Sequence, residues 1–228
     1  MPDRTRSVAT AGVVGALVAL VVALGAANPP TRTPVATDRL GPDSGEPVAE
    51  YLDRARASLA DTDTDTAEHW ALVSLTAELT DADAYRLAVG APGDPASRVR
   101  VSELLFRVPV ERVQTPLVVV GVAGPESAAR AADVAAGRLQ GSAGEWDRQA
   151  RVDAVSAARL SADCACVVGM TVRGDPEALR ALAATPGVRS VEALPADAVF
   201  GRFAVVPLLP GQAETVAPGP DDGDVPAR

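Results

Sequence analysis

The chain of 228 residues has no Lys and no Ile, and it has few of the residues on which many active sites depend. It holds one His (His69), two Cys, three Phe, two Tyr and two Trp. A single His would have to serve any hydrolytic triad, and no Gly-x-Ser-x-Gly elbow, P-loop or dinucleotide-binding glycine motif follows a strand. We therefore expect no catalytic residues, no metal ligands and no cofactor.

Positive charge is also in the minority, because 21 Arg face 30 Asp and Glu and the net charge is −9. Arg in place of every Lys, with abundant Ala, Val, Gly and Pro, indicates the codon bias of a GC-rich bacterial genome. The first 27 residues hold one acid against two Arg, so the acidity lies beyond them. This charge argues against nucleic acid and anionic lipid surfaces as partners.

One long hydrophobic run is present, the twenty uncharged residues from Val8 to Ala27. A helix of this length spans the hydrocarbon core of a bilayer, so residues 8–27 predict a single-pass transmembrane helix. We expect residues 1–7 in the cytoplasm and the rest of the chain outside it. The alternative is a signal peptide cleaved near Ala27, which would make the protein secreted. Small residues four apart would also allow two such helices to form a homodimer.

Two segments flank the predicted domain. Residues 28–46 are rich in Pro, Gly, Thr and Asp and predict a flexible spacer. Residues 210–228 hold Pro, Gly, Ala and acids and predict a disordered acidic tail. Residues 47–209 are then expected to form one extracytoplasmic domain.

Helical and strand patterns alternate within this domain. Apolar residues recur at helical spacing from Pro47, and Thr80 and Asp175-Pro176 are good helix starts. A long helical segment covers 125–160 with an interruption at 141–144. We expect strands at 70–79, 98–110, 117–122, 164–172, 188–193 and 203–208.

This order predicts an α+β fold, either a ferredoxin-like sandwich or a duplicated β-α-β sandwich, after the N-terminal helix. The segment DPEALRALAATPGVRSVEALPAD gives residues 167–197 a resemblance to the second half of the propeptide and inhibitor domains of subtilisin-like proteases. The resemblance implies a ferredoxin-like fold and, more loosely, a role in binding protein.

The two cysteines, Cys164 and Cys166, lie two residues apart in an expected strand. Extended residues at this spacing hold their Cα atoms near the limit of about 7 Å for a disulfide. The sequence therefore leaves open a buried pair of thiols or a local disulfide in a bent backbone. A metal or redox site is a third alternative.

These features favour a membrane-anchored, non-catalytic module that binds a protein or another component of the cell envelope. One alternative is a secreted or anchored thiol- or metal-dependent enzyme centred on Cys164 and Cys166. Another is a structural subunit of an envelope complex.

Overall fold

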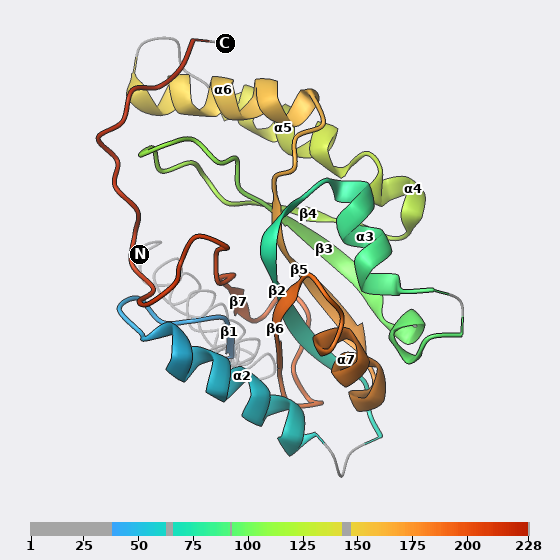
Figure 1. The fold of residues 1–228 in the computed structure, drawn as a ribbon. Helices are drawn as coiled ribbons and strands as arrows, with labels where there is room; N and C mark the ends of the chain where they lie inside the picture. Colours follow the sequence, from blue (N-terminus) through green and yellow to red (C-terminus); the bar gives the residue numbers. More distant parts are fainter. Residues whose placement is uncertain (1–37, 63–65, 92, 143–146, 228) are drawn as a thin grey trace, which may run out of the picture. The chain divides into compact units, whose positions relative to one another are not determined.

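Five strands form one antiparallel sheet in the order β4-β3-β5-β2-β6 (Figure 1). They belong to a computed structural model that describes residues 38–62, 66–91, 93–142 and 147–227. The mixture of helices with a single main sheet confirms the predicted α+β class. The strands of the sheet are β2 (His69–Leu79), β3 (Arg100–Phe106), β4 (Val118–Gly121), β5 (Val167–Gly174) and β6 (Val188–Ala193).

Helices cover the first face of the sheet. Their apolar side chains, such as Leu179 of α7, form one continuous core with residues of the strands, among them Leu104 and Met170. Ala fills most of the helical positions in this core, which lets the helices approach the sheet closely. These helices are α3 (Asp81–Val89), α4 (Pro125–Ala128), α5 (Ala131–Ser142), α6 (Arg148–Ser161) and α7 (Pro176–Ala183), with a short 3-10 helix η1 (Pro95–Arg98) before β3.

Local sequence explains where two of these helices begin and where one of them ends. The Thr80 hydroxyl accepts a hydrogen bond from the Asp83 N–H at 3.2 Å at the start of α3. The Asp175 carboxylate accepts one from the Ala178 N–H at 2.9 Å at the start of α7. The chain leaves α7 through Gly187, whose φ of 97° suits glycine. Strand β6 follows at once, over the residues predicted.

Segments from the two ends of the described chain cover the second face. Short strands β1 (Arg39–Leu40) and β7 (Ala204–Val205) pair in parallel, and helix α2 (Val48–Asp61) lies against β6. The apolar side chains here form two smaller clusters. The first is Leu40, Leu72, Leu105, Val168, Leu194 and Ala198, and the second is Val48, Tyr51, Ala55, Leu208 and Val216.

Three predicted strands differ from the observed ones by more than one residue at an end. Strand β3 ends at Phe106, opposite the first residue of its partner β5, and Pro109 lacks the N–H that pairing farther along would need. The strand expected at 164–172 begins at Val167, after a bend between the two cysteines. The strand expected at 203–208 is reduced to the two residues of β7.

Parts of the predicted spacer and tail make contacts in the structure. Leu40 is fully buried and paired with Val205, although residues 28–46 were expected to be flexible. In the C-terminal segment, the Val216 N–H donates to the Glu46 carbonyl at 2.9 Å and its side chain is buried. We call residues 206–227 the C-terminal strap. It is held by backbone hydrogen bonds that its composition did not indicate.

The hydrophobic run at residues 8–27 lies outside the described residues. Among the helices that the structure does describe, none is long and apolar enough to cross a membrane.

Candidate functional site

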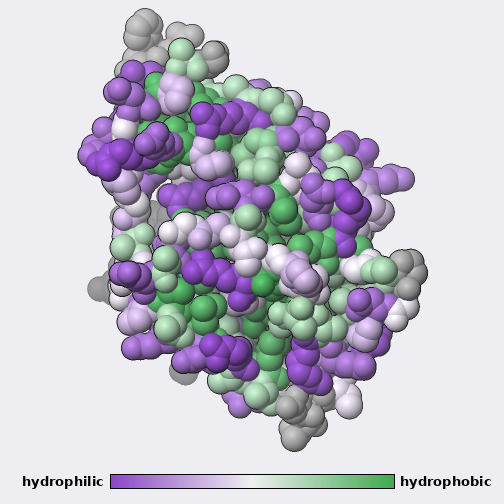
Figure 2. Space-filling model, viewed as in Figure 1, coloured by the Kyte–Doolittle hydropathy of each residue, from purple (hydrophilic) through white to green (hydrophobic). Residues whose placement is uncertain are grey.

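The candidate site is a group of three aromatic side chains, Trp70, Phe200 and Phe203, which we call the aromatic cluster. The Trp70 and Phe200 rings are stacked with centroids 4.6 Å apart, and Phe203 meets both at 6.1 and 6.2 Å. Phe200 remains 45% exposed and its neighbour Val199 54%. On the face drawn in Figure 2, hydrophobic and hydrophilic residues are interspersed. Stacked aromatics at the surface mark a place where a partner gains much contact area.

Backbone contacts hold this cluster in place. The Leu194 N–H donates to the Trp70 carbonyl at 2.8 Å, and His69 Nδ1 lies 2.8 Å from the Leu194 carbonyl oxygen. These contacts fasten the segment that follows β6 to the first residues of β2. A tight turn, closed by the Arg202 N–H to the Val199 carbonyl at 3.0 Å, then presents Phe200. The cluster is therefore preorganised on the sheet.

Charged residues lie beside the cluster. The Arg173 guanidinium is 5.3 Å from the Trp70 ring centroid, which permits a cation–π contact. The Glu68 carboxylate pairs with Arg100 at 2.7 Å and with Arg173 at 3.4 Å. The Arg100 guanidinium holds the pKa of Glu68 below its usual value. An apolar centre with charged neighbours resembles the core and rim of a protein interface.

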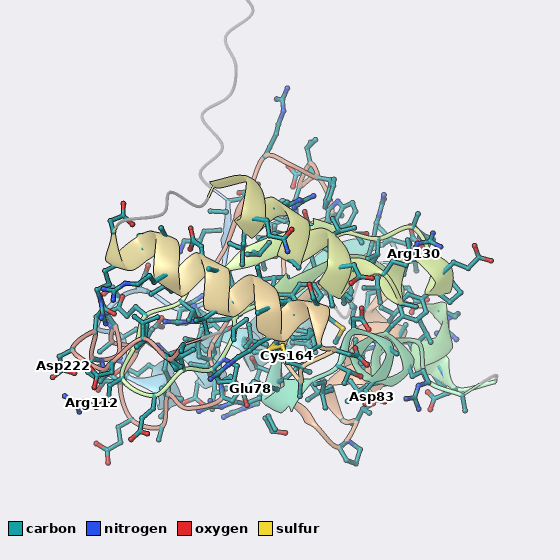
Figure 3. The ribbon with its side chains drawn as sticks, turned by 90° about the horizontal axis from the view of Figure 1, so that it is seen from above. Glu78, Asp83, Arg112, Arg130, Cys164 and Asp222 are labelled. Carbon is teal, nitrogen blue, oxygen red and sulfur yellow. A yellow bond between two sulfur atoms is a disulfide. The ribbon has the colours of Figure 1, made fainter. Side chains whose placement is uncertain are left out.

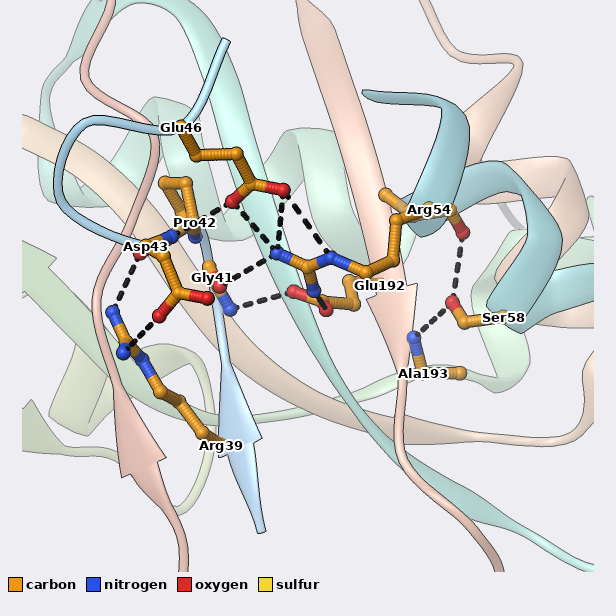
Figure 4. A network of polar contacts seen from close by, with 10 residues as sticks. Arg39, Gly41, Pro42, Asp43, Glu46, Arg54, Ser58, Glu192 and Ala193 are labelled. Atoms are coloured by element: carbon orange, nitrogen blue, oxygen red, sulfur yellow. Dashed lines mark hydrogen bonds and ion pairs between the residues drawn. The ribbon is translucent and has the colours of Figure 1, made fainter. Parts of the chain in front are cut away.

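A polar network lies on the same face of the sheet, between α2, the β1 turn and β6 (Figure 4). The Arg54 guanidinium forms ion pairs with Glu192 and, at 2.9 Å, with Glu46. The second oxygen of Glu192 accepts the Gly41 N–H at 2.5 Å. Burial raises the pKa of Glu192, although Gly41 and Arg54 both oppose that rise. The network joins three segments, so we assign it a structural role.

Tyr51 lies beneath this network and is fully buried. Its hydroxyl has no hydrogen-bond partner among the described residues. Burial, followed by the negative charge of Glu192, raises the pKa of Tyr51 to about 12. The phenol therefore stays protonated at physiological pH.

The two cysteines are joined by a disulfide in the turn between α6 and β5 (Figure 3). Their Cα atoms are 5.4 Å apart, which is shorter than an extended strand allows and requires the bend before Val167. Cys166 is buried in the core of the first face, whereas Cys164 is half-buried. Of the alternatives that the sequence left open, the structure has the local disulfide.

The aromatic cluster is the feature that sequence reasoning missed. Trp70 is 130 positions from Phe200, so no local pattern joins them. The available signal was the close spacing of Phe200 and Phe203, two of only three Phe in the chain.

In the part of the chain that the structure describes, no group of three or more His, Cys, Asp or Glu is placed to hold a metal ion.

Comparison with models of protein families, with characterised proteins and with solved structures finds no match for this chain.

Proposed function

We propose that this protein is a membrane-tethered, extracytoplasmic module that binds a protein partner through the aromatic cluster and performs no catalysis of its own. The observation that carries the proposal is the exposed Phe200, stacked on Trp70 and fixed to the sheet. Aromatic side chains are enriched at the energetic centres of protein interfaces. In a chain with so few aromatics, three together at the surface favour recognition over packing alone.

The charge of the chain supports a protein as the occupant. A net charge of −9 disfavours a second copy and an anionic lipid surface, because both would add like charge. Beside the cluster, however, Arg173 and Arg100 supply local positive charge that Glu68 only partly balances. A protein that is not strongly acidic overall, and that offers an apolar anchor residue beside a carboxylate, fits this combination best.

The proposed location depends on the run from Val8 to Ala27 and on the disulfide. Disulfides persist in oxidising compartments and are rare in the cytosol, so the Cys164–Cys166 bond supports a domain outside the cytoplasm. Fractionation of the native host followed by intact mass measurement tests the tether. A full-length protein in the membrane fraction is expected, whereas a protein shortened near Ala27 in the medium would replace the tether by secretion.

We also propose that the domain is ferredoxin-like with an insertion. Without β4 and α4 to α6, the chain runs β2-α3-β3-β5-α7-β6 and the strands lie in the order β3-β5-β2-β6. That is the β-α-β-β-α-β sequence of ferredoxin-like folds, which supports this assignment. The resemblance of residues 167–197 to protease propeptide and inhibitor domains agrees with a binding role.

A photo-crosslinking experiment tests the binding role in the native host. A photoreactive amino acid replaces Phe200 in the full-length chain, and in a matched control it replaces Val134, which is similarly exposed on α5. We expect a crosslink to one other protein from position 200 and none from position 134. Crosslinks at position 200 only to lipid, or only to a second copy of the chain, would contradict the proposal.

A second candidate function follows from the exposure of Cys164. Cys164 is half-buried and Cys166 is buried, so a protein with two thiols could attack the Cys164 sulfur. That protein would be oxidised to a disulfide while the Cys164–Cys166 bond is reduced to two thiols. Incubation of the oxidised protein with a reduced dithiol substrate distinguishes this thiol enzyme from the binding module. Oxidation of the substrate at a rate that C164S abolishes would favour the enzyme.

The third candidate, a structural subunit of an envelope complex, differs in having a permanent partner. Native electrophoresis of solubilised membranes separates the two cases. Migration only as part of one large complex favours the subunit, whereas a population of free protein favours the binding module.

A further inference from the structure

Arg107 follows β3, and its side chain has no role in the fold or in the proposed binding of a protein partner. Its N–H donates to the Cys166 carbonyl at 2.8 Å, which fixes the backbone. Its guanidinium is half-buried and has no ion pair or hydrogen bond within the described part of the chain. Burial lowers the pKa of Arg107. A partly desolvated cation without a counter-charge is unfavourable unless a bound anion supplies one.

Two cavities meet at this side chain, between the loop after β3 and the C-terminal strap. Their volumes are about 430 and about 300 Å³, within the range of small-molecule sites. Four residues line both cavities, so the two lie next to each other at Arg107. The shared residues are Arg107, Leu209, Gln212 and Ala217.

The strap that forms one wall is held in a fixed shape. The Arg189 guanidinium donates to the Leu209 carbonyl at 2.9 Å and to the Gln212 carbonyl at 2.5 Å. The Gln212 side chain accepts the Leu209 N–H at 2.9 Å, and Gln114 donates to the Gly219 carbonyl at 2.6 Å. Burial lowers the pKa of Arg189 too, but backbone carbonyls of the strap satisfy it. The Arg107 guanidinium has no equivalent partners within ranges 38–62, 66–91, 93–142 and 147–227.

The walls indicate what the cavity would accept. Leu117, Val206 and Val216 line the smaller cavity, which suits an aliphatic body. Arg39 also lines it, but Asp43 and the Pro42 carbonyl already engage that guanidinium. A single available guanidinium in an acidic protein favours a monoanion over a phosphate dianion.

One carboxylate of the chain competes for this position. Glu214 lines the larger cavity with Arg107, but no ion pair joins the two residues. We propose that the cavity at Arg107 binds a small aliphatic monocarboxylate, whose carboxylate pairs with the guanidinium while its chain lies against the apolar wall. Such a site would be independent of the aromatic cluster.

The test uses the full-length protein in detergent and a panel of straight-chain monocarboxylates from butyrate to decanoate, followed by titration calorimetry. We expect binding by at least one acid and none by the alcohol of equal length. R107Q is expected to weaken binding at least about tenfold, because a charge-assisted hydrogen bond is lost. The exposed Arg202 provides the control R202Q, which should bind like the native protein.

Two further arms make the outcome decisive. E214Q removes the competing carboxylate and should strengthen binding, and R107K should lie between native protein and R107Q even if R107Q folds poorly. No binding by any acid of the panel, equal binding of acid and alcohol, or tighter binding of inorganic phosphate would each overturn the proposal. Crosslinking at Phe200 reports on a separate surface, so failure of one proposal leaves the other standing.

Discussion

The two faces of the central sheet are covered by different kinds of chain. Helices α3 and α7, each of which lies between two strands of the sheet along the chain, cover part of the first face and contribute to one continuous apolar core. The second face is covered by α2, β1, β7 and the C-terminal strap, which come from the two ends of the described chain. Its clusters are smaller, and buried charge lies beside them. The first face is thus covered by helices that local sequence patterns predict, and the second by segments that are held in place by contacts with residues distant in sequence.

Adjacent leucines in β3 provide the most direct test of this difference. Leu104 and Leu105 are both fully buried, but Leu104 faces the continuous core and Leu105 the smaller cluster. We expect L104A to lower the free energy of unfolding by about 3 to 5 kcal/mol and L105A by about 2 to 3 kcal/mol, because the larger core relaxes less around a cavity. Urea denaturation measures both values. Equal losses would show that the two faces are energetically alike.

A pair of glycines near β1 tests how tightly the second face is closed. Gly41 and Gly45 both have positive φ, but a Cβ on Gly41 would lie 1.7 Å from the Val206 carbonyl oxygen, whereas one on Gly45 would meet nothing within 4 Å. G45A should cost about 1 kcal/mol for backbone strain alone. G41A should cost about 2 to 4 kcal/mol, because it also separates β1 from β7.

Thermal unfolding and limited proteolysis of the two glycine variants check this prediction. The G41A variant should be cleaved faster within the C-terminal strap than G45A. Similar stability and cleavage of both variants would mean that the strap contributes little to the fold.

The contrast between the two faces also explains which parts of the fold could be predicted from the sequence. The Asp175-Pro176 start, the Pro186-Gly187 stop and the following strand lie next to one another, so local rules predicted α7 and β6 well. Leu40 is buried because β7 and the sheet are folded over it, and no property of the neighbouring Pro- and Gly-rich residues signals that. A segment without a periodic pattern of apolar residues takes its structure from contacts with residues distant in sequence.

The aromatic cluster could not be predicted from the sequence either, for the same reason. Trp70 and Phe200 are brought together by hydrogen bonds between β2 and the residues after β6. Arg107 resembles any other Arg in a chain that uses Arg throughout, and it is distinguished by being half-buried with no partner for its guanidinium among the residues that the structure describes. The sequence shows that the two cysteines lie two residues apart, but it does not determine whether they form a disulfide, because a disulfide at this spacing requires a bend in the backbone.

Glu192 tests the electrostatics of the second face. Because burial raises its pKa in the folded state, the folded protein binds this proton more tightly than the unfolded chain does. The stabilisation is therefore complete below the unfolded value of about 4.5 and is lost as the pH rises through the folded pKa. E192Q resembles the protonated form, so the native protein should lose stability relative to E192Q over that rise.

E192A provides the companion measurement. It leaves the Gly41 N–H without its acceptor and should lower the free energy of unfolding by about 1 to 3 kcal/mol. Urea denaturation of the native protein, E192Q and E192A from pH 4 to pH 8 gives both results. A gain of the native protein over E192Q with rising pH would mean that the Arg54 ion pair outweighs burial.

A small effect is expected from the disulfide, which lies at the edge of the first face. Its ring closes over only Ala165, so the loss of chain entropy in the unfolded state is small, and C164A/C166A should lower the free energy of unfolding by about 1 to 2 kcal/mol. Reductant should lower the stability of the native protein by a similar amount and leave the double variant unchanged. Because the core of the first face rests on Leu and Val packing, either treatment should leave the L104A penalty unaltered. A larger penalty after reduction would show that the disulfide, and not the helices alone, keeps that core closed.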